Sequence, residues 1–139
     1  INFHPKQGMV LMCDFGLECE GFAPPEIFKE RPVLIISDRN KCSNGLCTVI
    51  PLSTQEPTPF RQFHLAIPKE VMPVSMQKEQ SWAKCDLITH VSFKRLNLIR
   101  TKRKMADSGK RGYERATFPP DLVQEIINCI NYHIKKIDN

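Results

Sequence analysis

The chain has 139 residues, of which 41% are apolar and 25% are charged, as in a single ordinary globular domain. No apolar run approaches the ~20 residues that cross a bilayer, and the first residues lack the pattern of a secretory leader, so we expect neither. The net charge is +5, but residues 94–115 alone hold nine basic and two acidic side chains. This basic block predicts either contacts with phosphate groups or a solvated loop that keeps the protein soluble.

The spacing of the six cysteines fits neither a zinc site nor a disulfide framework, since no CxxC pair is present. Cys13, Cys85 and Cys129 lie in apolar segments, where a free cysteine behaves as a small hydrophobe. We therefore expect reduced thiols in a cytoplasmic protein that uses no metal and no other cofactor.

Six short apolar segments predict β-strands, because they are rich in apolar or β-branched residues and are bounded by glycine, proline or polar residues. The strands are expected at residues 8–15, 32–37, 46–52, 60–67, 81–88 and 90–93. A long loop, residues 16–30, follows the first strand, and Asn44-Gly45 predicts a turn between the second and the third.

The last predicted element is an amphipathic helix that opens at residues 117–121, where two prolines precede an aspartate. Its apolar residues recur every four positions, at Leu122, Ile126, Ile130 and Ile134. Short strands joined by hairpins and followed by one helix predict a mainly β fold. We expect a small antiparallel barrel, formed by one domain over residues 1–139, with the helix over one open side.

Arg31 and Ser53 are the two residues whose positions suggest chemistry. Arg31 begins one strand of a hairpin and Ser53 ends its partner, so antiparallel pairing brings them to the same end. A guanidinium and a hydroxyl suit phosphate, and RNA supplies its own nucleophile, so cleavage without a metal is chemically feasible. The alternative is that Arg31 caps a strand and Ser53 opens a turn. The four scattered histidines are expected to be structural.

The sequence resembles the MazF/PemK/Kid toxins of bacterial type II toxin–antitoxin modules. The resemblance rests on segments in the family's order: GMVLMCDF (8–15), RPVLIIS (31–37), TVIPLST (48–54), WAKCDLI (82–88) and GKR (109–111). It implies an SH3-like barrel of the CcdB/PemK type that is usually a homodimer. It also implies a metal-independent, sequence-specific endoribonuclease, or mRNA interferase, that cuts single-stranded RNA and stops translation and growth. The implied partners are RNA and a cognate antitoxin, with no membrane.

The resemblance also assigns roles to individual residues. Arg31 falls on the family's catalytic arginine and Ser53 on its catalytic threonine, with Thr54 beside it as an RNA contact. Glu26 matches an acidic position in the first long loop, and Asp86 belongs to a triplet with catalytic or RNA-binding roles in the Kid branch. Glu26 and Asp86 are both candidates for the general base. The other expected RNA contacts are Lys84, Lys102, Arg103, Lys110 and Arg111.

Three departures separate this sequence from the family pattern. Ser53 replaces the commoner threonine, Lys84 replaces an arginine and so lacks its planar fork, and the loop at 16–30 is longer than usual. Because a fold does not fix a function, a CcdB-like inhibitor without catalysis and a module that only binds RNA or antitoxin stay open as alternatives. Retention of Arg31 and of the hydroxyl at Ser53 favours the endoribonuclease.

Overall fold

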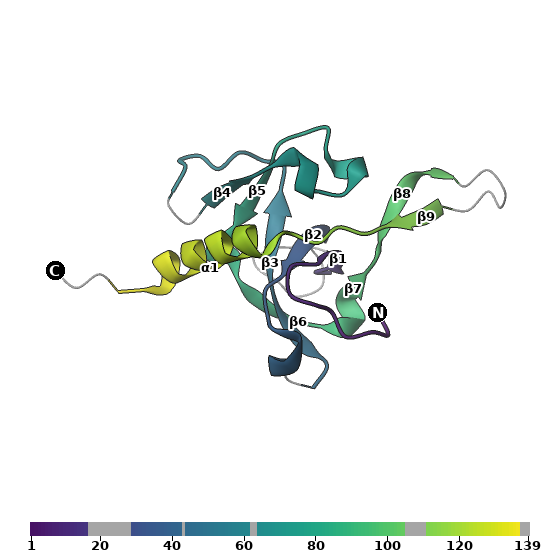
Figure 1. Ribbon diagram of the computed structural model, residues 1–139, viewed down its shortest axis with the longest axis horizontal. Helices are drawn as coiled ribbons and strands as arrows, with labels where there is room; N and C mark the ends of the chain where they lie inside the picture. Colours follow the sequence, from purple (N-terminus) through teal and green to yellow (C-terminus); the bar gives the residue numbers. More distant parts are fainter. Residues whose placement is uncertain (17–28, 43, 62–63, 105–110, 137–139) are drawn as a thin grey trace.

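The computed structural model describes residues 1–16, 29–42, 44–61, 64–104 and 111–136. The strands in these ranges are β1 (Val10–Asp14), β2 (Glu30–Ile35), β3 (Leu46–Ser53), β4 (His64–Ile67), β5 (Ser81–Lys84), β6 (Thr89–Ser92), β7 (Leu96–Asn97), β8 (Ile99–Lys104) and β9 (Arg111–Glu114). Short 3-10 turns lie between them: η1 (Arg39–Lys41), η2 (Lys69–Val71), η3 (Val74–Met76), η4 (Cys85–Leu87) and η5 (Phe93–Arg95). The helix α1 (Pro120–Ile134) follows the last strand (Figure 1).

One antiparallel sheet forms the body of the molecule, with the strand order β4-β5-β3-β2-β1-β7 and β6 paired to β3. Strand β3 pairs with β6 and β2 over its first part and with β5 at its end, so it joins the two halves of the sheet. The expected class, mainly β with a C-terminal helix, is confirmed. The pairings of the described strands form an open path, and closure into a full barrel is not among them.

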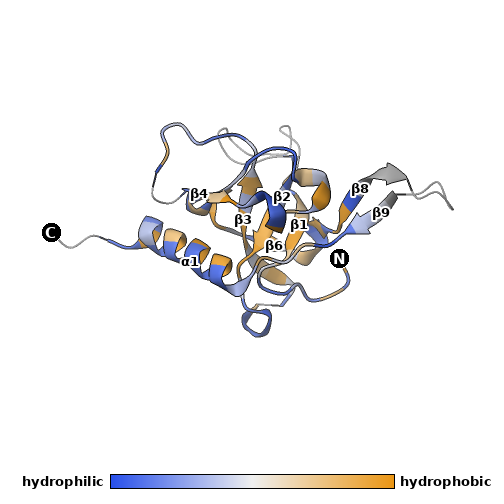
Figure 2. Ribbon diagram, turned by 45° about the horizontal axis from the view of Figure 1, so that its top comes forward, coloured by the Kyte–Doolittle hydropathy of each residue, from blue (hydrophilic) through white to orange (hydrophobic). Residues whose placement is uncertain are grey.

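Two buried clusters use alternate residues of the same strands, as period-2 alternation requires. The first contains Leu34 and Ile50 and is covered by α1, whose Ile126 is fully buried. The second contains Val33 and Val49, which lie on the opposite side of the sheet. A fully buried aliphatic side chain of this kind contributes about 1.5–3 kcal/mol. Figure 2 shows the apolar residues gathered in the central strands, with polar residues in the outer loops.

The basic block differs most from its expected form. No strand was predicted in it, but it contains β7 and a separate two-stranded ribbon of β8 and β9. We call this ribbon the arm; it projects from the body on the side away from the C-terminus (Figure 1). The base of the arm is fixed by Glu114 Oε2, which accepts hydrogen bonds from Ser75 N at 3.2 Å and Ser75 Oγ at 2.5 Å.

Two predicted strands are too long. The strand expected at 81–88 ends at Lys84, because the next residues turn into η4 and bury Cys85 against α1 and the sheet. The strand expected at 60–67 begins only at His64. The predicted helix is confirmed, with Pro120 in its first turn and a buried stripe of Leu122, Ile126 and Ile130.

Candidate active site

Arg31 lies on β2 at the base of the long loop. Its Cα pairs with that of Cys13 on β1, and its own side chain is exposed. Two backbone hydrogen bonds close the loop at this point, from Phe15 N to Lys29 O at 2.9 Å and from Lys29 N to Gly16 O at 2.6 Å. The arginine is therefore presented by a strand that is paired to β1, rather than by the loop itself.

Ser53 is the last residue of β3 and is half-buried. Its Oγ accepts a hydrogen bond from Gln55 N at 3.1 Å, which orients the hydroxyl, and Thr54 next to it is exposed. The pairing of β2 with β3 ends at Val33 and Pro51. Arg31 and Ser53 each lie two residues beyond that last pair, so both stand at the same open end of the hairpin, as predicted.

Register and alternation bring further residues to the same side of the sheet. Ser53 is opposite Trp82 on β5, and Lys84 on β5 is opposite His64 on β4. Directly opposed residues share a face, and so do residues two apart on one strand. We call the resulting surface the site face; it lies on the side of the sheet away from α1. Its members are Arg31, Ser53, His64, Trp82 and Lys84.

His64 and Asp86 form a pair beside the site face. His64 Nε2 lies 3.6 Å from Asp86 Oδ1, and the two side chains are 10% and 26% exposed. The backbone N–H of Arg61 donates to His64 Nδ1 at 3.1 Å, so the neutral ring carries its proton on Nε2, the nitrogen nearer Asp86. Burial lowers the pKa of His64, while the Asp86 carboxylate acts in the opposite direction.

Asp86 Oδ1 is buried and makes no hydrogen bond to any described residue. Such an atom is costly unless a donor satisfies it, and Nε2–H of His64 stands just beyond hydrogen-bond distance. From the sequence alone His64 was expected to be structural, and its pairing with Asp86 was not predicted. No local motif signals it, because the two residues meet only through the pairing of β4 with β5.

Aromatic side chains adjoin the pair. The ring of Phe60 lies 5.8 Å from that of Trp82 and 6.0 Å from that of His64, measured between centroids. Phe60 is 56% exposed, so its ring presents apolar surface beside Trp82 and His64 of the site face. Exposed aromatic rings of this kind stack on the bases of single-stranded nucleic acid.

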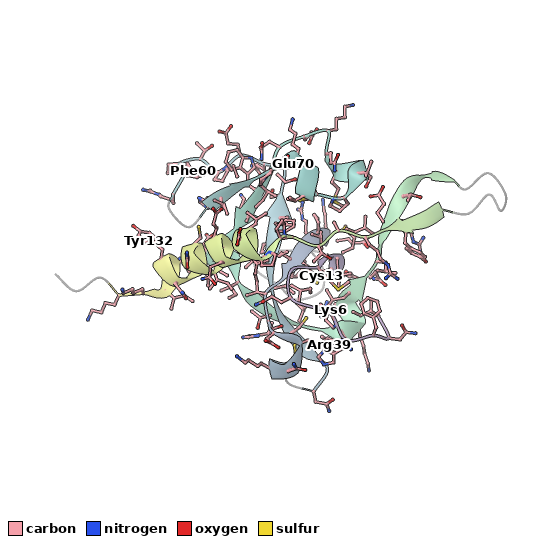
Figure 3. All side chains as sticks on the ribbon, viewed as in Figure 1. Lys6, Cys13, Arg39, Phe60, Glu70 and Tyr132 are labelled. Carbon is pink, nitrogen blue, oxygen red and sulfur yellow. The ribbon has the colours of Figure 1, made fainter. Side chains whose placement is uncertain are left out.

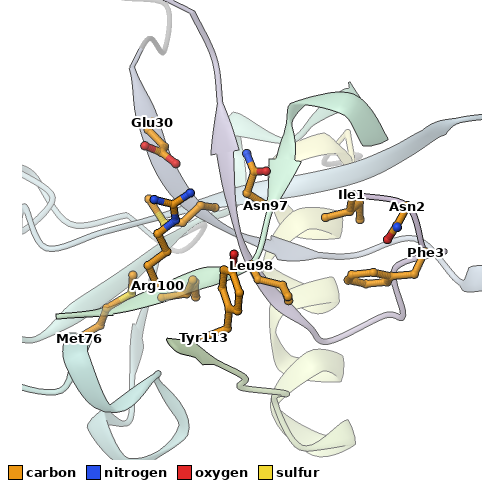
Figure 4. A pocket seen from close by; sticks show the side chains of 11 residues that line it. Ile1, Asn2, Phe3, Glu30, Met76, Asn97, Leu98, Arg100 and Tyr113 are labelled. Carbon is orange, nitrogen blue, oxygen red and sulfur yellow. The ribbon is translucent and has the colours of Figure 1, made fainter. Parts of the chain in front are cut away.

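A cleft of about 760 Å³ lies on the other side of the start of β2. Figure 4 shows Glu30, Arg100 and Tyr113 around it, with Arg100 contributed by the arm. Glu30 and Arg31 are neighbours on one strand, so their side chains leave it on opposite sides. The cleft and the site face therefore meet at the start of β2.

The remaining predicted residues are only partly placed. Glu26 and Lys110 lie outside the described residues. Lys102 and Arg103 belong to β8 and Arg111 to β9, so their backbones lie in the arm, while their side chains lie outside the description. Lys84, in the site face, and Asp86, next to His64, are both half-buried.

In the ranges that the structure describes, histidine, cysteine and acidic side chains form no group of three that would hold a metal ion. No described helix combines the length and the apolarity needed to span a bilayer. The described cysteines, Cys13, Cys42, Cys47, Cys85 and Cys129, form no disulfide with one another. Burial raises the pKa of the Cys85 thiol to about 12, which keeps it protonated.

Comparison with known families identifies the family of the chain. The model for the PemK-like, MazF-like toxins of type II toxin–antitoxin systems matches residues 6–131. The chain belongs to this family. The resemblance inferred from its sequence segments is thereby confirmed, over nearly the whole chain.

Relatives by sequence include the uncharacterized protein YifN of Escherichia coli K12, which is 33% identical over 99% of this chain and 96% of its own length. A Haemophilus influenzae protein is 33% identical over 70% of this chain and 73% of its own. Among solved structures, MazF from Deinococcus radiodurans has a TM-score of 0.63 at 15% identity, over 94% of this chain and 96% of MazF. A mycobacterial endoribonuclease bound to its cognate antitoxin has a TM-score of 0.58 at 17% identity, over 94% of each chain. At identities of 15% and 17%, these two solved structures show that this PemK/MazF-family chain shares their fold.

Proposed function

We propose that this PemK/MazF-family toxin is a metal-independent endoribonuclease that cuts single-stranded mRNA. The observation that carries the proposal is the common position of Arg31 and Ser53 at the open end of the β2–β3 hairpin, two residues beyond the last pair. A guanidinium and an oriented hydroxyl are suitable donors for the charge that develops on a phosphoryl group. The aromatic surface of Phe60, whose ring lies against Trp82 of the site face, suits the bases of an unpaired strand.

The reaction needs three tasks from the protein's own groups. A base takes the proton of the 2′-hydroxyl, the 2′-oxygen attacks phosphorus, and a five-coordinate phosphorane forms. Arg31 and Ser53 stabilise its non-bridging oxygens. The bond from phosphorus to the 5′-oxygen then breaks and that oxygen takes a proton, for which Arg31 is a candidate donor. The products are a 2′,3′-cyclic phosphate and a 5′-hydroxyl.

Two carboxylates are candidates for the base. Asp86 is held next to His64. The Nε2–H group of the neutral histidine would orient the Asp86 carboxylate without placing a full positive charge beside it. Glu26 belongs to the loop whose base carries Arg31. Asp86→Asn and Glu26→Gln, assayed separately, distinguish the two, because a general base contributes about 10²–10⁴-fold to the rate.

We further propose that the protein acts in the cytoplasm as a homodimer, with RNA bound by the site face, the cleft and the arm. The relative from mycobacteria is an endoribonuclease in complex with its antitoxin. A corresponding acidic antitoxin would counter the basic arm and block access to Arg31.

The deciding experiment is an in-gel assay of a long single-stranded RNA with the purified protein in EDTA. Cleavage in EDTA with cyclic-phosphate ends is the expected result. Strict dependence on added magnesium would show that cleavage uses a metal and would contradict the proposed mechanism. Intact RNA together with a growth defect would favour a CcdB-like inhibitor without catalysis. RNA binding with neither cleavage nor a growth defect would indicate a binding module.

A further inference from the structure

A second pocket lies at the opposite end of β2 from Arg31. It has a volume of about 510 Å³, and its lining includes three cationic side chains from distant parts of the chain: Lys6, Arg39 and Arg115. We call it the cation pocket. Figure 3 shows Lys6 and Arg39 close together on the side of the molecule away from Phe60. The stretch of β2 from Arg31 to Ile35 alone separates the two ends by about 13 Å.

The fold explains why these residues converge. Gly8 N donates to Ile35 O at 2.8 Å, which ties the N-terminal segment to the end of β2. Met9 bridges to Thr117, which ties the same segment to the connection between β9 and α1. Gly8 has φ +92° and an added Cβ would meet Phe118 O at 3.3 Å, so glycine permits this close crossing.

The charges of the cation pocket are not balanced locally. No carboxylate is among the residues recorded as lining it, and no acidic side chain of the described chain forms a salt bridge with Lys6, Arg39 or Arg115. Three like charges around one cavity repel one another, and a bound anion relieves that repulsion. The pocket thus favours a ligand that carries more than one negative charge.

Other lining groups narrow the chemistry of the ligand. Phe3 contributes a half-buried aromatic ring, and Gln7 and Thr117 contribute an amide and a hydroxyl. Gln7 Nε2 already donates to Ile36 O at 2.7 Å, which fixes the position of its amide. Guanidinium groups bind phosphate through paired hydrogen bonds, and an aromatic ring stacks on a base. An acidic peptide would match the charges but leave the ring without a stacking partner.

We infer that the cation pocket binds the phosphates and a base of a nucleotide chain, away from the bond that is cut. This inference rests on the proposed function in one respect, since the ligand is the same single-stranded RNA. The strand would pass from the Arg31 end of β2 to the pocket at the other end. Short RNAs that reach only Arg31 and Ser53 would not contact it.

The test measures binding by fluorescence anisotropy, in an Arg31→Ala background that prevents cleavage. The test variant is Lys6→Ala/Arg39→Ala/Arg115→Ala. The control removes three exposed lysines outside the pocket, Lys69→Ala/Lys78→Ala/Lys135→Ala. Both variants lose the same charge, and thermal melting checks that both are folded. The probes are RNAs of about 5 and about 16 nucleotides, adenosine triphosphate, and a polyglutamate peptide.

We expect the test variant to bind the longer RNA at least tenfold more weakly, and to lower its salt slope by about 2, as three lost phosphate contacts require. The control and the shorter RNA should change little. Loss of adenosine triphosphate binding as well would support the pocket and identify a free nucleotide as a second source of the ligand. An equal loss in the control, no loss for either nucleotide probe, or a loss confined to polyglutamate would overturn the inference.

The assay also separates this inference from the proposed function. Wild-type protein that fails to cut RNA while the pocket variant loses RNA affinity would reject the endoribonuclease and keep the pocket. Wild-type protein that cuts RNA while the pocket variant binds the longer RNA normally would keep the endoribonuclease and reject the pocket.

Discussion

Strand β2 has a different chemical environment at each end. On the Arg31 side of the sheet both signs of charge are present, with Glu30 next to Arg31 on β2 and with Lys84, His64 and Asp86 on β5, β4 and η4, which lie beyond β3. At the other end, the residues recorded as lining the cation pocket include three cations and no carboxylate. Proton transfer needs an acid and a base near one phosphate, whereas binding needs only opposite charge. The Arg31 end of β2 is therefore suited to catalysis, and the end at the cation pocket is suited to RNA binding.

The largest effect should come from removing Arg31, compared with removing Arg39 at the other end of β2. Arg31→Ala should reduce cleavage of a short RNA by about 10³-fold and Ser53→Ala by about 10²-fold, since each removes a donor to the phosphorane. Arg39→Ala is the matched control at the other end and should leave that rate unchanged. The measurement is the single-turnover rate on a short RNA. An Arg31→Ala protein with full activity would end the proposed division of roles.

A smaller effect is expected for the arm. Neutralising Arg100, Lys102, Arg103 and Lys104 together should weaken binding of long RNA by about tenfold and lower the salt slope by about 3, because each phosphate contact adds about 0.7. The sequence that is cut should not change, since phosphate contacts position and base contacts specify. Binding titrations at several salt concentrations, with mapping of cut sites, test both statements. An unaltered salt slope would assign the arm to solubility or to the dimer.

The His64–Asp86 pair should make stability depend on pH. Burial holds the pKa of His64 below its ordinary 6.5, so the unfolded chain binds a proton more readily than the folded one. Stability should therefore fall as the pH drops from above 6.5 toward the lower folded pKa. His64→Gln keeps an N–H donor but does not titrate, so its stability should vary less over that window. Urea unfolding at pH 5.5, 6.5 and 7.5, values about one unit apart around the ordinary pKa of histidine, tests this. If the stability of the wild-type and His64→Gln proteins varied equally with pH, burial of His64 would not be the cause of the dependence.

The smallest perturbation compares two thiols. Cys85 in η4 is fully buried and burial raises its pKa to about 12, while Cys42 follows η1, which contains Arg39, and is only half-buried. Iodoacetamide at neutral pH should label Cys42 and leave Cys85 and Cys13 unmodified, because the thiolate is the reactive form. Mass spectrometry of the native protein gives the sites. Rapid labelling of Cys85 would show that η4 opens readily and loosens the support of Asp86.

Several features were predictable because they depend on neighbours in sequence. The stripe of Leu122, Ile126 and Ile130 predicts both α1 and its buried face, and the β2–β3 hairpin follows from two apolar runs around a turn. The common end of Arg31 and Ser53 is a consequence of that hairpin. The arm was missed because its strands are dominated by charged residues, whose pattern is that of a solvated loop.

The sequence by itself therefore determined the mainly β class, the terminal helix, the family and the hairpin that carries Arg31 and Ser53. Tertiary structure alone decided which distant residues meet: His64 with Asp86 through the pairing of β4 with β5, and Lys6 with Arg39 and Arg115 where Gly8 crosses the end of β2. The physical reason is that periodicity and turn chemistry act over a few residues. Contacts between distant segments are set by strand order and register, which depend on how the whole core packs.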